Sequence, residues 1–250
     1  MNPEELSALI LCCLFGGALL GVWLRGALPA NHLDNETKDL VKLGVGLVGT
    51  MAALLLGLLV ASTKSSYDAR SGELTQMAAN VILLDRLLMH YGPETAETRE
   101  LLKTSVAQIL DQIWPKEGRG EGGLGAQTIG SAILDQLQEL VPRTDAQRAL
   151  QSQAESIAMN LAQTRWLLFE QSGSSISTPF LIVVVFWLTT LFVSFGLFAP
   201  RNPTAISVLF VSALSVAGAL FLILELDHPF IGVMQISSTP VRNALALIGK

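Results

Sequence analysis

Four stretches of the chain consist almost entirely of apolar residues. They run from Leu6 to Leu24, from Leu43 to Ser62, from Phe180 to Ala199 and from Ala205 to Leu226, and none has a charged residue near its centre. About 20 apolar residues in a helix cross the roughly 30 Å of hydrocarbon in a bilayer. The pattern therefore predicts four transmembrane helices. The first follows an acidic N-terminus rather than the positive region of a signal peptide, so we expect it to be permanent.

The segment between the second and third stretches is more polar, but its apolar residues recur at helical spacing. They alternate in steps of three and four at Tyr67, Leu74, Met77, Val81, Leu84, Leu88 and Tyr91. This is the heptad seam of a coiled coil or a helical bundle, and Arg70 is the one seam position that breaks it. No proline separates this seam from the second stretch, which predicts one continuous helix through both, either straight or kinked near Ser65, Ser66 or Gly72.

Glycine and proline residues divide the rest of the polar segment into shorter helices and a loop. Gly92-Pro93 ends the seam helix, and three further helices are expected, one of them with Val141 on its apolar face. A loop with five glycines is expected at Lys116–Gly125. After the fourth span, Thr239-Pro240 begins a short amphipathic helix that lies against the bilayer or against the bundle.

These patterns together predict an all-α polytopic membrane protein. Residues 1–62 hold transmembrane helices 1 and 2, and residues 63–178 form a helical extramembrane domain inserted between the second and third spans. Residues 179–227 hold helices 3 and 4, and residues 228–250 form a C-terminal interfacial segment.

Composition agrees with a chain that uses lipid as part of its solvent. Half of the 250 residues are hydrophobic and 15% are charged, against about 25% charged in soluble domains. The net charge of -5 provides no basic surface for nucleic acid. The two cysteines, Cys12 and Cys13, are adjacent within the first span, which argues against a disulfide or a metal site.

The chain shows no pattern typical of an active site. His32, His90 and His228 lie in three different segments without metal-ligand spacing. Neither a phosphate-binding glycine loop with its lysine nor a Gly-x-Ser-x-Gly elbow is present. We therefore expect a protein that is not an enzyme and that binds no metal and no cofactor.

The second span carries one narrow face of small residues with a lysine at each end. At about 100° per residue, this face falls within an arc of about 80° and contains Lys42, Gly46, Gly49, Ala53, Gly57 and Lys64. One interpretation is a pore-facing stripe whose terminal cations attract anions. The other is close helix packing, with the lysines as ordinary membrane anchors. Both hold together if the second helices surround a symmetry axis, which implies a homo-oligomer.

Two further features stand in the other spans. Gly17-x-x-x-Gly21 in the first span predicts a helix-packing face. Glu225 and Asp227 end the fourth span, where acids at a membrane edge bind a cation, sense a proton or are simply hydrated.

Several stretches resemble the bestrophin-like bacterial membrane proteins. The similarity is carried by Lys38-Asp39-Leu40-Val41-Lys42-Leu43-Gly44, by Met51 to Ser62, by Thr75 to Asn80 with Leu83-Leu84-Asp85-Arg86, and by Glu225-Leu226-Asp227-His228-Pro229-Phe230-Ile231-Gly232. The resemblance covers nearly the whole chain. It implies two spans, a helical cytosolic region and two more spans, as in bestrophins, which are pentameric anion channels with cytoplasmic termini.

What the resemblance implies sets the remaining expectations. We expect a multi-pass protein of a bacterial inner membrane, with the middle domain cytoplasmic, and an oligomeric channel for small inorganic anions. The alternative is a non-conducting membrane scaffold or sensor whose helical domain binds a partner. Bestrophins narrow their pore with bulky, largely aromatic residues, whereas the stretch from Leu43 to Ser62 contains no aromatic residue.

Overall fold

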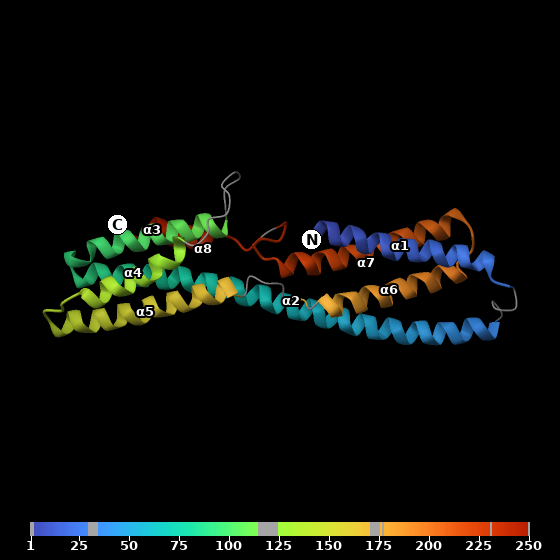
Figure 1. Ribbon diagram of the computed structural model, residues 1–250, viewed down its shortest axis with the longest axis horizontal. Coiled ribbons are helices and arrows are strands. Elements are labelled where there is room, and N and C mark those ends of the chain that lie inside the picture. Colours follow the sequence, from blue (N-terminus) through green and yellow to red (C-terminus); the bar gives the residue numbers. More distant parts are fainter. Residues whose placement is uncertain are drawn as a thin grey trace. The chain divides into compact units, whose positions relative to one another are not determined.

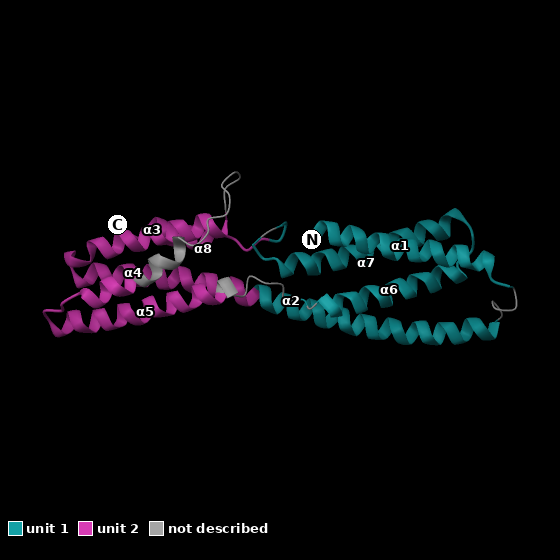
Figure 2. Cartoon of the chain, in the orientation of Figure 1, with its two compact units in different colours: residues 1–67, 174–234 teal, residues 68–173, 235–250 magenta. Residues whose placement is uncertain are grey.

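The helices fall into two compact units, which Figure 2 distinguishes by colour. The computed structural model describes residues 3–29, 35–114, 125–170, 176, 178–230 and 232–249. One unit comprises residues 1–67 and 174–234 and is called the apolar unit below, and the other comprises residues 68–173 and 235–250 and is called the polar bundle. The described residues contain helices and no strand, so the all-α fold class is confirmed.

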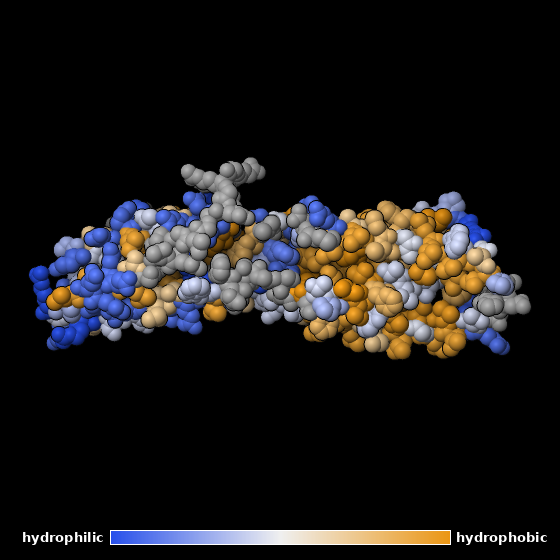
Figure 3. All heavy atoms as spheres, viewed as in Figure 1, coloured by the Kyte–Doolittle hydropathy of each residue, from blue (hydrophilic) through white to orange (hydrophobic). Residues whose placement is uncertain are grey.

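Among the described residues, four helices are long and apolar enough to cross a membrane. They are α1 (Pro3–Ala27), α2 (Asn35–Tyr91), α6 (Thr178–Phe198) and α7 (Pro203–Asp227), all labelled in Figure 1. Each contains one of the four predicted stretches, except that Ala199 lies just beyond α6, which confirms four apolar helices of membrane-spanning length. Figure 3 shows apolar side chains gathered over α1, α6, α7 and the first part of α2.

The second of these helices does not end with its apolar stretch. α2 runs unbroken for 57 residues, belonging to the apolar unit as far as Tyr67 and to the polar bundle from Asp68 onward. This confirms the prediction of one continuous helix, which follows from the absence of proline. Tyr91 is its last residue, and Gly92, at φ 139°, ends it.

α1 packs against both α6 and α7, and its closest approach is to α6. A Cβ atom at Gly21 would overlap the carbonyl oxygen of Val193, and one at Gly196 would overlap the carbonyl oxygen of Ala18. A Cβ at Gly17 would lie 3.0 Å from Thr189 Cγ2. Only small residues allow backbones this close, and in lipid close packing is a main source of helix association. The predicted packing face at Gly17 and Gly21 is confirmed.

The polar bundle is built on the heptad seam. The second part of α2 packs with η2 (Pro93–Thr95), α3 (Ala96–Ile113), α4 (Gly125–Glu139), α5 (Asp145–Glu170) and α8 (Thr239–Leu247). Six of the seven predicted seam residues are buried: Leu74, Met77, Val81, Leu84, Leu88 and Tyr91. Arg70, which breaks the apolar pattern, is buried as well. Val141 is exposed beyond the end of α4, so its predicted place on an apolar face is wrong.

The C-terminal helix α8 packs against α3 of the polar bundle. Val241 and Ala244 are its buried residues, followed by the buried Ile248. Trp114 donates a hydrogen bond from Nε1 to the carbonyl oxygen of Ile236, at 3.0 Å. Of the two surroundings open to this helix in the sequence, the bundle therefore covers its apolar face. The glycine-rich loop expected at 116–125 lies outside the described residues, except for its last residue.

Candidate functional site

Within the apolar unit, α2 buries one side against the other helices. Ala52 and Leu59 are buried in the core, with Val45, Val48 and Leu55 packed partly against it. Since these residues recur at helical spacing, they mark one continuous face. The polar residue Thr63, near the end of this buried face, is also buried, and its Oγ1 donates to the carbonyl oxygen of Leu59 at 2.7 Å.

The small-residue face of α2 points elsewhere and is largely uncovered. Nothing in the described part of the chain lies within 4 Å of a Cβ atom built at Gly46 or Gly57, and Ala53 is exposed. A Cβ at Gly49 would reach only Leu191 Cδ2, at 4.0 Å. In contrast to Gly21 and Gly196, these small residues make no tight helix contact within the described chain.

A row of large apolar residues lies beside the small-residue face. At about 100° per residue its centre is rotated by roughly 120° from that face, and its members are Leu40, Leu43, Leu47, Met51, Leu54 and Leu58, all exposed. We call this row the leucine stripe. The small face and the leucine stripe together leave the greater part of the circumference of α2 without cover from the chain's own described helices.

The two lysines at the ends of the small-residue face have different neighbours. Lys42 Nζ lies 2.9 Å from Asp39 Oδ1, and both side chains are about 70% exposed. Lys64 Nζ lies 5.2 Å from the centre of the Tyr67 ring, in cation–π geometry. The charge of Lys42 is therefore partly compensated by a carboxylate on its own helix, and the Lys64 ammonium is held beside an aromatic face.

The acids at the end of α7 are buried, with Glu225 2% and Asp227 3% exposed. Glu225 Oε2 accepts hydrogen bonds from the backbone N–H groups of Val233, at 2.6 Å, and Met234, at 3.2 Å. Gly232 has φ +97°, and a Cβ atom there would overlap the Glu225 carboxylate. Both acids are thus buried, and Glu225 binds the backbone of the returning chain, whereas their binding of a cation or a proton stays a prediction.

His228, the one histidine beside these acids, faces its own helix. Its Nδ1 lies 3.0 Å from the carbonyl oxygen of Leu224, which makes Nδ1 the protonated nitrogen. Among the residues that the structure describes, no group of three or more His, Cys, Asp or Glu side chains is placed to hold a metal ion. Of the other histidines, His90 Nδ1 lies 2.7 Å from Arg86 O, and His32 is outside the described residues.

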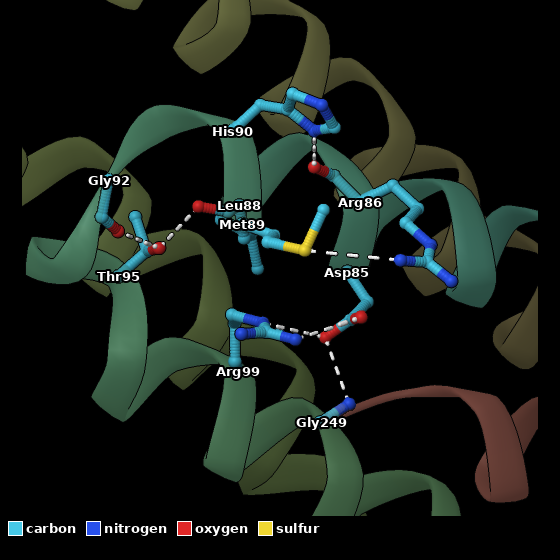
Figure 4. A network of polar contacts seen from close by, with 9 residues as sticks. All are labelled: Asp85, Arg86, Leu88, Met89, His90, Gly92, Thr95, Arg99 and Gly249. Carbon is cyan, nitrogen blue, oxygen red and sulfur yellow. Dashed lines mark hydrogen bonds and ion pairs between the residues drawn. The ribbon is translucent and has the colours of Figure 1, made fainter.

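A buried ion pair in the polar bundle was not recognised from the sequence (Figure 4). Arg99 donates from Nε to Asp85 Oδ1 at 2.8 Å and from Nη2 to Asp85 Oδ2 at 3.2 Å. The hydrogen bond to Asp85 raises the pKa of the Arg99 guanidinium. A signal was available, because Asp85 and Arg99 stand seven residues before and after Gly92, so an antiparallel helix pair turning there brings them together.

Four apolar helices of membrane-spanning length, in a chain whose described elements are all helical, define a polytopic helical membrane protein. The chain belongs to the bestrophin-like family, because the family model described as the Bestrophin-like domain matches residues 12–241. A solved structure of a bacterial bestrophin homolog from Klebsiella pneumoniae, in a mutant form, is similar with a TM-score of 0.67 and 13% identity. The similarity covers 98% of this chain and 99% of that one and establishes the fold. No curated protein sequence matches the chain.

Proposed function

We propose that the protein is the subunit of an oligomeric anion channel of bestrophin-like type, with copies of α2 surrounding the pore. The observation that carries the proposal is the uncovered small-residue face of α2, at Gly46, Ala53 and Gly57. Glycine and alanine offer lipid little apolar surface, but they allow helices to approach closely or leave space along an axis. A second copy of α2 is the natural neighbour for such a face.

The charges on this helix support a preference for anions. Lys42 and Lys64 are exposed near the two ends of the uncovered face, and no acid lies between them on α2. Repeated around a symmetry axis, each becomes a ring of positive charge, which raises the local anion concentration and repels cations. Asp39, paired with Lys42, weakens the ring at that end.

The proposed setting is a bacterial inner membrane with the polar bundle as a cytoplasmic domain. Family membership supports this setting, together with the two points at which the chain enters the polar bundle, residue 68 and residue 235. Reporter fusions test the topology. A cytoplasmic signal from fusions at the C-terminus and within the glycine-rich sequence 116–124 agrees with it, and periplasmic signals from both overturn it.

Reconstituted bilayers under a chloride gradient test conduction and its selectivity. Wild-type protein is expected to show a reversal potential that is displaced from zero towards the chloride equilibrium potential. The double variant Lys42→Glu/Lys64→Glu should move the reversal potential towards the equilibrium potential of the cation. Asp39→Asn should move it further towards that of chloride. Arg148→Glu reverses a single charge on α5, outside the small-residue face of α2, and serves as the control.

The outcome that overturns the channel is equally specific. If purified wild-type oligomer passes no ions at any voltage or pH tried, the scaffold alternative replaces the channel. If ions pass but the lysine variants and Arg148→Glu behave alike, α2 does not set selectivity. A monomer in mild detergent also counts against the proposal, since a single α2 cannot enclose an axial pore.

A further inference from the structure

Two arginines meet where α1 and α6 end. Arg25, in the last turn of α1, donates from Nη1 to the carbonyl oxygen of Ala199, just after α6. Arg201 donates from Nη2 to the carbonyl oxygen of Val22, on α1, at 3.2 Å. Each side chain thus binds the backbone of the opposite helix. Cations are favoured at helix C-termini, and the exchange fixes both guanidinium groups in place.

The Arg201 guanidinium lies against the last turn of α1, which also carries Arg25. A Cβ atom at Gly26 would overlap Arg201 Nη2 and lie 2.9 Å from its Cζ, so Arg201 rests on the residue that follows Arg25. No carboxylate pairs with either group within the described ranges. A guanidinium has five N–H donors, and the bonds above use one from each. Donors and positive charge therefore remain for an anion.

The same turn borders an apolar hollow. It has a volume of about 330 Å³ and is lined by Ala199, Pro200, Asn202, Thr204, Ala205, Val208 and Leu209. Val208 is 60% exposed on α7, so the apolar wall continues along the outside of the helix. A free phosphate ion gains nothing from such a wall, whereas a hydrocarbon chain does.

An exposed tryptophan marks the depth of the site in the bilayer. Trp23 is 66% exposed on α1, two residues before Arg25. Tryptophan is enriched at the boundary between the hydrocarbon and the headgroups. This position predicts that Arg25 and Arg201 lie at the level of the lipid phosphates, next to the hollow.

From this geometry we propose that Arg25 and Arg201 bind the phosphate of an anionic phospholipid whose acyl chain lies against the hollow at Ala199–Leu209. Guanidinium groups bind phosphate oxygens in bidentate, charge-assisted geometry. Two of them, paired with no carboxylate of the described residues, favour a lipid with net negative charge over a zwitterionic one. None of the residues of this site belongs to the small-residue face of α2.

Native mass spectrometry of the full-length protein, with phosphatidylglycerol or phosphatidylcholine titrated in, measures the proposed binding. Wild type is expected to bind phosphatidylglycerol about tenfold more tightly than phosphatidylcholine. Arg25→Gln/Arg201→Gln should lose this preference. Lys38→Gln/Lys42→Gln removes two positive charges from α2, near its N-terminus, and should keep it. Equal preference in the two double variants overturns the proposal and leaves the arginines as helix caps.

Two further measurements distinguish the binding of a lipid from the binding of a free ion. Ala205→Leu fills part of the hollow and leaves both arginines, so it should weaken phosphatidylglycerol binding. Glycerol phosphate should compete poorly with the intact lipid. Unchanged lipid binding in Ala205→Leu, or full competition by glycerol phosphate, overturns the lipid assignment. If the arginine double variant does not fold, Ala205→Leu decides the question alone.

Discussion

Arg99 and Asp85 form a bidentate ion pair across the helix turn at Gly92, and the Asp85 carboxylate also accepts a hydrogen bond from the Gly249 backbone N–H at 3.3 Å. Asp85 is 2% exposed. One buried carboxylate therefore joins three segments of the polar bundle: the end of α2, the start of α3 and the chain after α8 (Figure 4).

Arg99→Met is expected to lower the stability of the polar bundle. The change leaves the buried Asp85 charge without its main partner, which costs about 3–5 kcal/mol and lowers the melting temperature by several degrees. Arg148→Met breaks the exposed ion pair with Asp145 and should leave the melting temperature unchanged, since such pairs contribute little to stability. Differential scanning fluorimetry of the purified protein makes the comparison. Equal melting temperatures in both variants would show that the buried pair is dispensable.

Gly21→Ala should destabilise the apolar unit, because its methyl group would overlap the Val193 carbonyl oxygen of α6. The two backbones must then separate, with loss of the close contacts that hold these helices together in lipid. Gly16→Ala on the same helix meets nothing within 4 Å and is the matched control. Thermal unfolding in detergent is the measurement, and a normal melting temperature for Gly21→Ala contradicts the tight contact.

Gly57→Leu is expected to disturb assembly without disturbing the fold of the subunit. No described atom lies within 4 Å of a Cβ atom there, so the single chain accommodates the larger side chain. A neighbouring copy packed on the small-residue face does not. Light scattering after size-exclusion chromatography should show a smaller particle of unchanged helical content. Gly218→Leu makes the same change at an open position on α7, and an identical loss of mass in this variant would rule out a specific α2 contact.

Gly232→Ala should weaken the turn that follows α7. The position has φ +97°, which costs a non-glycine residue about 1–3 kcal/mol, and the new methyl group would also strike the buried Glu225 carboxylate. Gly249, at φ +75°, carries the same kind of conformational cost, but a Cβ atom there would meet only the flexible Lys103 side chain at 3.3 Å. Gly249→Ala should therefore lower the melting temperature less than Gly232→Ala. The reverse order would contradict the role given to Glu225.

Local patterns along the sequence determined the helices and much of their packing. Apolar runs of about 20 residues identified the four spans because span length is fixed by bilayer thickness. Heptad spacing identified the seam of the polar bundle because side chains three and four residues apart share one helix face. The continuity of α2 followed from the lack of a proline. Gly17 and Gly21 were recognised as a contact because small residues at this spacing are typical of close helix pairs.

The tertiary structure alone decided which partner each face meets. Gly21 and Gly57 look alike in sequence, yet one lies against the α6 backbone and the other has no neighbour in the described chain. Glu225 ends an apolar run as a surface acid does, but the chain returns over it with two backbone N–H donors. Arg25 and Arg201, 176 positions apart in the sequence, come together because α1 packs on α6. Periodicity along one helix records only that helix, whereas these contacts depend on where the other helices lie.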